Sequence, residues 1–257
     1  MLADSNRVQG YKEAIYKYCK DKIVLDFGAG TGLLGLLAFK AGAKEVWFVE
    51  QENVMREYIK NHCTLNGFND FKIVENISDL PKGIFEVVIS ETFGDNVIEE
   101  SIIFYNQVIL NNPGCVAIPD EVNFYHEVVS LVPVNNFYKN INSYGLRFNE
   151  CFTSLNSPMD VQIYGLKINN SRNIFSLSLM ESLPIIVDFN VIPPIFENSN
   201  SSLIWWEART KGDYVTSNSP HLDDNGFNHW KQLLIPANRN YRLFFKIKTG
   251  KLILDFK

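Results

Sequence analysis

The sequence lacks several features that mark other classes of protein. No apolar run approaches the roughly 20 residues that a membrane-spanning helix needs. The first residues have neither the basic flank nor the apolar stretch of a signal peptide. The four cysteines, Cys19, Cys63, Cys115 and Cys151, have neither zinc-ligand nor disulfide-framework spacing. These absences favour a cytoplasmic protein with reduced thiols, no bound metal and no membrane association.

An excess of basic residues is also absent. The chain has 24 Lys and Arg against 29 Asp and Glu, a formal net charge of -5, and no Lys/Arg-rich stretch. Because nucleic-acid backbones are bound mainly through Lys and Arg, we expect no direct nucleic-acid partner. The acidic balance is compatible with a basic substrate. At 257 residues the chain can form one large domain or two of modest size.

Up to about residue 118, short apolar runs alternate with helical patterns. Strands are predicted at 23–25, 45–50, 71–74, 85–89 and 115–118, and helices at 33–39, 51–65 and 98–110. In the second of these helices the apolar positions are Val54, Tyr58, Ile59 and Cys63. The alternation predicts an α/β domain with a parallel, doubly wound sheet over residues 1–118.

After residue 118 the helical periodicity fades. Short β-rich runs separated by Asn, Ser, Pro and Gly lie at 122–132, 174–179, 185–192, 203–206, 241–248 and 252–256. They predict a second, mostly antiparallel β domain over 119–257. The segment 135–158 fits neither pattern, and we interpret it as a helical insertion.

A glycine-rich loop follows the first predicted strand and opens a helix. It contains Gly28, Gly30 and Gly32, preceded by Asp26. Glycine lets the backbone approach a ligand, and a helix N-terminus favours negative charge. A dinucleotide fingerprint would need glycine at the position of Leu33. The observed GxGxG form resembles motif I of the S-adenosylmethionine-dependent methyltransferases, and a purely structural turn is the alternative.

Two polar residues end the next predicted strands. Glu50 lies where nucleotide-binding folds use an acid to hold ribose hydroxyls, although it could be an ordinary surface acid. Asn76 follows the third strand, where it would face an adenine or simply form a turn.

Two glutamates, Glu91 and Glu100, follow the strand at 85–89. Each alone is typical of a solvated surface acid. Together they lie on a loop at the carboxyl end of a strand, where open α/β sheets bind ligands. A pair of carboxylates there predicts a cationic substrate, and a planar guanidinium suits it best. The Asn/Asp-Pro-Pro-Tyr/Phe tetrapeptide of methyltransferases that act on bases or glutamine does not occur.

The spacing of these glutamates resembles the double-E loop of the protein arginine N-methyltransferases. Four more segments resemble the family in the right order: residues 1–7 with Tyr11 and Ala14-Ile15, Ile118-Pro119-Asp120, Tyr144-Gly145-Leu146 and Asn228-His229-Trp230-Lys231-Gln232. In the family these form the segment ahead of motif I, the junction with a β-barrel, the start of a dimerisation arm and the Thr-His-Trp loop. The resemblance therefore implies a homodimer with an arm at about 135–158.

The resemblance also implies a role for each matching residue. S-adenosyl-L-methionine would be bound by Gly28, Gly30 and Gly32 after Asp26, by Arg7 at its methionyl carboxylate, and by Glu50 and Asn76 at its nucleoside. Glu91 and Glu100 would clamp the target guanidinium. Asp4 and His229 would brace the N-terminal segment against the barrel. Trp230 would stack on the guanidinium, unless His229 and Trp230 only pack in the barrel core.

The implied activity is methyl transfer to arginine in proteins or peptides. Guanidinium nitrogens are poor nucleophiles, and two carboxylates would hold the positive charge away from the reacting nitrogen. We expect direct transfer with inversion. Asn228 replaces the family's usual Thr, Ile102 replaces a Met of the asymmetrically dimethylating members, and the aromatic N-terminal helix of the family does not precede Met1. A non-catalytic partner of an active paralogue and an enzyme for a small guanidine remain the alternatives.

Overall fold

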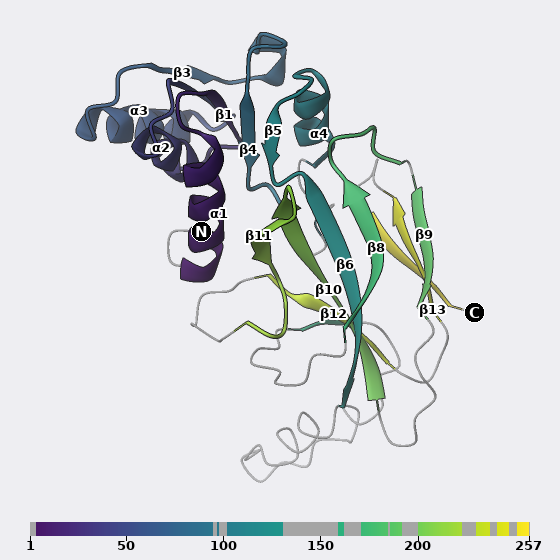
Figure 1. Ribbon diagram of the computed structural model, residues 1–257. Helices are drawn as coiled ribbons and strands as arrows, with labels where there is room; N and C mark the ends of the chain where they lie inside the picture. The colour runs from purple at the N-terminus through teal and green to yellow at the C-terminus, as the bar shows by residue number, and fades with distance from the viewer. Residues whose placement is uncertain are drawn as a thin grey trace.

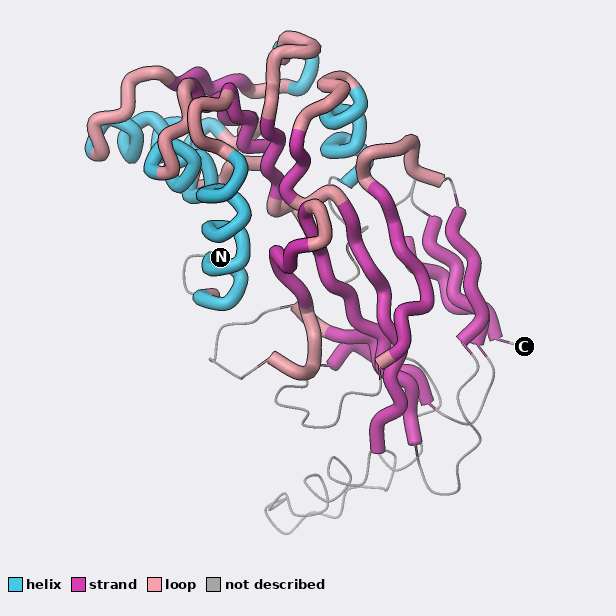
Figure 2. The backbone as a smooth tube through the Cα atoms, in the orientation of Figure 1, coloured by secondary structure: helices cyan, strands magenta, loops and turns pink. Residues whose placement is uncertain are grey.

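The computed structural model describes ten stretches of the chain. These are residues 4–94, 97, 102–130, 159–161, 171–184, 186–191, 200–222, 230–236, 241–246 and 251–256. Helices gather in one half of the molecule and strands dominate the other half (Figure 2).

The first half is a parallel sheet with helices around it (Figure 1). Its elements are α1 (Ser5–Tyr18), β1 (Ile23–Phe27), α2 (Leu33–Lys40), β2 (Glu45–Val49), α3 (Asn53–Leu65), β3 (Phe71–Val74), the short 3₁₀ helix η1 (Ile77–Asp79), β4 (Val87–Ser90), α4 (Ile102–Leu110) and β5 (Val116–Ile118). The strands are ordered β3-β2-β1-β4-β5, and every neighbouring pair is parallel. The predicted parallel α/β sheet is confirmed, and its strand order is that of a Rossmann-like domain.

The second half is built of antiparallel strands. They are β6 (Glu121–Ser130), β7 (Met159–Val161), β8 (Arg172–Ser178), β9 (Ile186–Val191), β10 (Asn200–Thr210), β11 (Asp213–Ser217), β12 (Gln232–Pro236), β13 (Tyr241–Lys246) and β14 (Lys251–Phe256). One sheet has the order β7-β12-β10-β6-β8, with β11 also paired to β10, and the other has the order β14-β13-β9. The predicted antiparallel β domain is confirmed, whereas the insertion at 135–158 lies outside the described residues.

Helix α1 was not predicted from periodicity, and it joins the two halves of the molecule. Its Asp4 cap accepts a hydrogen bond of 3.2 Å from the amide of Arg7, which satisfies one of the first-turn donors. A Cβ built on Gly10 would lie 1.9 Å from the carbonyl oxygen of Val215 on β11. Glycine therefore lets the helix backbone pack directly against the β domain. On the other side, Ala14 and Ile15 are buried in the core of the α/β half.

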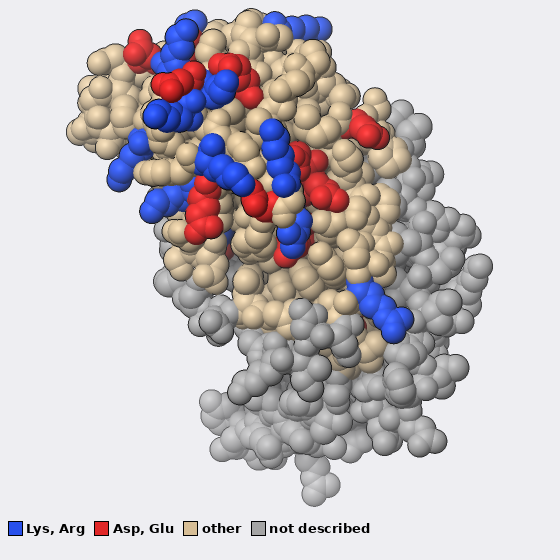
Figure 3. Space-filling model, in the orientation of Figure 1, with Lys and Arg blue, Asp and Glu red and all other residues tan. Residues whose placement is uncertain are grey.

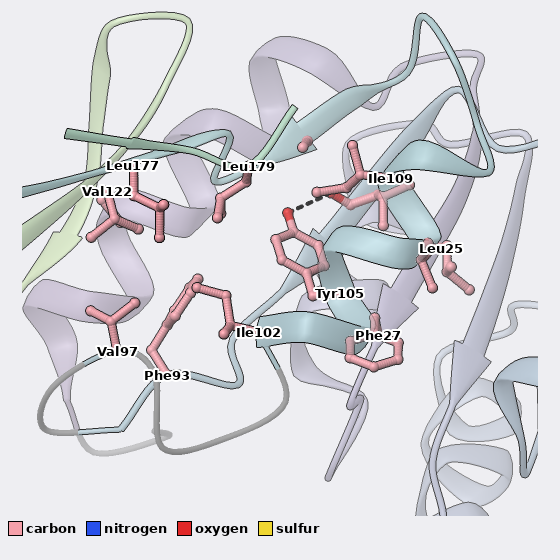
Figure 4. Packing of buried hydrophobic residues seen from close by; sticks show 14 of the residues in the cluster. Leu25, Phe27, Phe93, Val97, Ile102, Tyr105, Ile109, Val122, Leu177 and Leu179 are labelled. Carbon is pink, nitrogen blue, oxygen red and sulfur yellow. Dashed lines mark hydrogen bonds between the residues drawn. The ribbon is translucent and has the colours of Figure 1, made fainter. Parts of the chain in front are cut away.

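A continuous apolar core also spans the two halves. Leu25 and Phe27 of β1 belong to the same cluster as Val122 and Leu177 of the β domain (Figure 4). Within it, the hydroxyl of Tyr105 on α4 donates to the carbonyl oxygens of Pro119, at 2.8 Å, and Val88, at 3.3 Å. The junction between the halves is therefore a packed interior, and the boundary at 118/119 falls between β5 and β6.

The apolar pattern predicted for α3 is only half buried. Ile59 and Cys63 pack in the core, whereas Val54 is 62% exposed and Tyr58 is 49% exposed. The helix covers the sheet along a narrow face, so the other two positions point outward. Among the described residues no helix is long and apolar enough to cross a membrane. On the face in Figure 3, basic and acidic side chains of the described part are interspersed.

Candidate functional site

The glycine loop has the backbone geometry that its sequence requires. Gly28, Gly30 and Gly32 have φ values of 70°, 53° and 81°, a region that side chains with a Cβ rarely adopt. The amides of Gly28 and Ala29 both donate to the carbonyl oxygen of Val49, which holds the loop at the carboxyl end of the sheet. A Cβ built on Gly30 would meet nothing within 4 Å. The loop therefore borders open space at the N-terminus of α2, which suits a bound nucleoside.

Asp26 shapes this loop from inside the protein. Its carboxylate is buried, and it accepts a hydrogen bond of 2.8 Å from the amide of Gly35. Burial raises the pKa of Asp26 to about 7, the Gly35 N–H opposes this shift, and the charge of Glu50 adds to it. In the structure Asp26 thus stabilises the turn between β1 and α2 through this hydrogen bond. Its direct contact with a cofactor stays a prediction.

Glu50 lies at the end of β2 and faces the same loop. Its carboxylate accepts hydrogen bonds from the amides of Gly30, at 2.7 Å, and Glu52, at 2.9 Å. These amides orient the acid beside the open space next to Gly30. Asn76 follows β3, at the same edge of the sheet, and is exposed at the start of η1. Both positions are compatible with a nucleoside at this edge, because parallel strands end here together.

The second group of predicted residues meets at the start of α1. Arg7 forms an ion pair with Glu91, and its predicted pairing with a cofactor carboxylate stays a prediction. Both side chains are buried, at 5% and 8% exposure. The guanidinium carbon of Arg7 also lies 3.9 Å from the ring centroid of Trp230. The guanidinium of Arg7 therefore makes two of the contacts that the sequence assigned to an arginine substrate.

Two hydrogen bonds fix the walls of this site. The indole Nε1 of Trp230 donates to the carbonyl oxygen of Phe93 at 2.9 Å, which ties the β domain to the loop after β4. The hydroxyl of the fully buried Tyr11 donates to the carbonyl oxygen of Ser90 at 2.7 Å, directly before Glu91. Burial raises the pKa of Tyr11, so its hydroxyl remains a donor.

Part of the predicted site lies outside the described residues. Glu100 and His229 are among these positions, so the convergence of Glu91 with Glu100 and the pairing of Asp4 with His229 stay predictions. Asp4 itself is buried at the start of α1 and caps the helix.

Sequence reasoning missed three contributors to the site. Tyr11 was noted only for its resemblance, while Phe93 and Trp206 were not considered. Trp206 on β10 packs against Trp230, with ring centroids 4.8 Å apart, and against Phe93 at 5.9 Å. The pair of adjacent tryptophans on β10 was the available signal, but alternation along a strand alone does not reveal which of them faces the site.

Comparisons with known proteins show which methyltransferases the chain is similar to. The family model of the ribosomal protein L11 methyltransferase (PrmA) matches residues 13–110. The Arabidopsis thaliana protein named "Probable protein arginine N-methyltransferase 1.2" is 37% identical over 138 residues, which cover 49% of this chain. The match spans 37% of that relative's length.

Two solved structures extend the similarity to the whole chain. The crystal structure of PRMT6 superposes with a TM-score of 0.77 over 100% of this chain and 98% of that chain, at 17% identity. The Trypanosoma brucei PRMT1 enzyme-prozyme complex with AdoHcy gives 0.69 over 100% and 92%, at 20% identity. At such identities the structures establish the fold. Taken with the sequence relatives, they show that the chain is similar to protein arginine N-methyltransferases, in sequence over about half of its length and in fold over all of it.

Proposed function

We propose that the chain transfers a methyl group from S-adenosyl-L-methionine to a guanidinium nitrogen of arginine in proteins or peptides. The observation that carries the proposal is the environment of Arg7. A guanidinium lies against the carboxylate of Glu91 and over the indole of Trp230, both of them buried. These are the contacts by which a carboxylate and an aromatic ring recognise a planar cation.

The residues around the glycine loop fit the cofactor. Backbone at positive φ borders open space beside Gly30, and the Glu50 carboxylate lies at the edge of that space. When bound, S-adenosyl-L-methionine supplies an electrophilic methyl group. Glu50 and Asn76 would bind the nucleoside of the cofactor, and the methyl group would then face the loop after β4.

Glu91 would act on the substrate by electrostatics. Its carboxylate holds positive charge on the nitrogens that it contacts, which leaves electron density on the remaining nitrogen. Arg7 pairs with Oε1 of Glu91, and Oε2 is the second acceptor oxygen of this carboxylate. A substrate guanidinium can therefore share Glu91 through Oε2, or displace Arg7 from Oε1. Trp230 would set the plane of the substrate group.

The proposal is tested with radiolabelled S-adenosyl-L-methionine and an arginine-rich peptide. Glu91→Gln keeps the shape but removes the charge, so we expect a loss of turnover of about 100-fold. Calorimetric titration should give a cofactor affinity within about threefold of wild type. Glu86→Gln is the matched control, because Glu86 is exposed and pairs with Lys22 at the opposite end of the sheet. Absence of methyl transfer by the wild-type chain to any arginine peptide contradicts the proposal.

A second candidate is a non-catalytic partner of an active paralogue. It is favoured by the ion pair of Arg7 with Glu91, because that contact engages the predicted catalytic carboxylate within the chain itself. The same experiment separates the two functions. A partner would be indifferent to Glu91→Gln, and it would raise methyl transfer only when the paralogue is present. Kinetics with free arginine and with an arginine peptide would distinguish a protein substrate from a small guanidine.

A further inference from the structure

Asn218 lies at the base of the segment that leads to Trp230. It follows β11 directly and is 1% exposed, while Trp230 comes just before β12. Sequence reasoning gave this residue no role, and it forms hydrogen bonds with Trp206, Lys231 and Gln232. These hydrogen bonds hold the chain on both sides of Trp230, at Trp206 on β10 and at the residues that follow Trp230.

On one side Asn218 holds strand β10. Its side-chain Oδ1 accepts a hydrogen bond of 2.7 Å from the amide of Trp206, and its own amide donates to the carbonyl oxygen of Trp206 at 3.2 Å. Trp206 is the ring against which Trp230 packs. Asn218 therefore fixes the backbone of the residue that supports the indole from behind.

On the other side Asn218 holds the residues that follow Trp230. Its Nδ2 donates to the carbonyl oxygen of Lys231 at 2.6 Å. Its carbonyl oxygen accepts a hydrogen bond of 2.7 Å from Nε2 of Gln232, which is fully buried. One buried asparagine thus uses its amide, its carbonyl and both ends of its side chain to join β10 to the start of β12.

These contacts define the orientation of the indole. The backbone beside Trp230 is held by Asn218 and Gln232, and the far end of the ring is held by the bond from Nε1 to Phe93. Because both ends of the indole are held, the orientation of its face is fixed. The guanidinium carbon of Arg7 lies over this face. Small displacements of a positioning group are costly for a reaction that depends on alignment.

We propose that Asn218 is a positioning residue that, with Gln232, fixes Trp230 for guanidinium stacking. The proposal rests on the proposed function. It states that Asn218 increases the affinity for the substrate through Trp230, without contacting the substrate itself. Loss of the Asn218 contacts lets the indole tilt, which weakens binding of the arginine side chain. Cofactor binding at the opposite side of the site does not depend on them.

The test compares Asn218→Ala with Asn112→Ala. Asn112 is also a buried amide whose two ends are bonded, to Phe85 and Val108, but it lies at the amino end of β4. For Asn218→Ala we expect the KM for an arginine peptide to rise about fivefold, as for partial loss of a cation–π contact, with the KM for S-adenosyl-L-methionine unchanged. Equal peptide KM values for the two variants overturn the proposal.

A second readout does not require methyl transfer. Acrylamide should quench the tryptophan fluorescence of Asn218→Ala about twofold more strongly than that of wild type, and Trp230→Phe should abolish the difference. An unchanged quenching constant contradicts the positioning role even where the wild-type chain proves inactive. Inactivity of wild type with increased quenching in the variant contradicts only the proposed function. If circular dichroism shows Asn218→Ala to be unfolded, Gln232→Met, which removes one donor at similar length, replaces it in both measurements.

Discussion

Arg7 and Glu91 form a buried ion pair between the first turn of α1 and the loop after β4. The pair joins an element that packs on the β domain to the carboxyl end of the parallel sheet. Because Trp230 covers the same guanidinium, residues from three separate parts of the chain meet at one group. The site therefore depends on the docking of α1 as much as on its own loops.

Removal of the Arg7 side chain should create a site for a small guanidinium. In Arg7→Ala the buried carboxylate of Glu91 loses its partner, which lowers stability. Guanidinium chloride at about 20 mM should then raise the melting temperature of this variant by about 3 °C, because the ion binds the folded state. Wild type should show no rise.

The control for this prediction is Arg56→Ala. Arg56 pairs with Glu75 at the surface of α3 and has no aromatic partner among the described contacts. Its removal should give no guanidinium response. Differential scanning fluorimetry with sodium chloride at equal ionic strength measures the effect, and an equal shift in both variants would exclude a specific site.

Gly10→Ala should destabilise the protein although alanine is the better helix former. The helix propensity gain is at most about 1 kcal/mol. The added Cβ would lie 1.9 Å from the carbonyl oxygen of Val215, so α1 must move away from β11, at a cost of about 2 kcal/mol or more. Urea denaturation checks the sign. Gln9→Ala, on the exposed face of α1, is the control and should be near neutral.

The pH dependence of stability should contain a contribution from Asp26. Its pKa is raised from 3.8 to about 7 in the folded state. Between about pH 4 and pH 7 the folded state therefore holds a proton on Asp26 that the unfolded state has lost. The contribution of this proton to the unfolding free energy is complete below about pH 4 and is lost as the pH rises through about 7. It amounts to a few kcal/mol. Asp26→Asn should flatten the unfolding free energy between pH 4 and pH 7, and an unchanged slope would contradict the assignment.

Removal of His221, which is partly exposed, should be costly because it is a partner of the buried Glu127. Glu127 is 2% exposed and lies 2.8 Å from Nε2 of His221 and 2.9 Å from the hydroxyl of Ser171. His221→Ala leaves the carboxylate with one fewer partner, and we expect a loss of about 3 kcal/mol. The double variant with Glu127→Gln should recover part of it, because no charge remains buried. Chemical denaturation of both variants gives the comparison.

Local sequence determined the parallel half of the fold. Short apolar runs, glycines at the turn and the acids that end the strands predict β1 to β5 and the loop around Gly30, because their causes lie within a few residues. Local sequence does not decide whether Val54 and Tyr58 are buried. Periodicity gives the apolar positions of a helix, but only packing decides how wide a face is buried.

Tertiary structure alone decided how the residues of the site contact one another. Nothing near Arg7 in the sequence indicates that its guanidinium lies between Glu91 and Trp230, since these residues are far apart along the chain. The place of Arg7 follows from the close approach of α1 to β11 at Gly10, and the place of Trp230 follows from Asn218 and Phe93. Such contacts arise when the two halves pack together, and no local pattern encodes them.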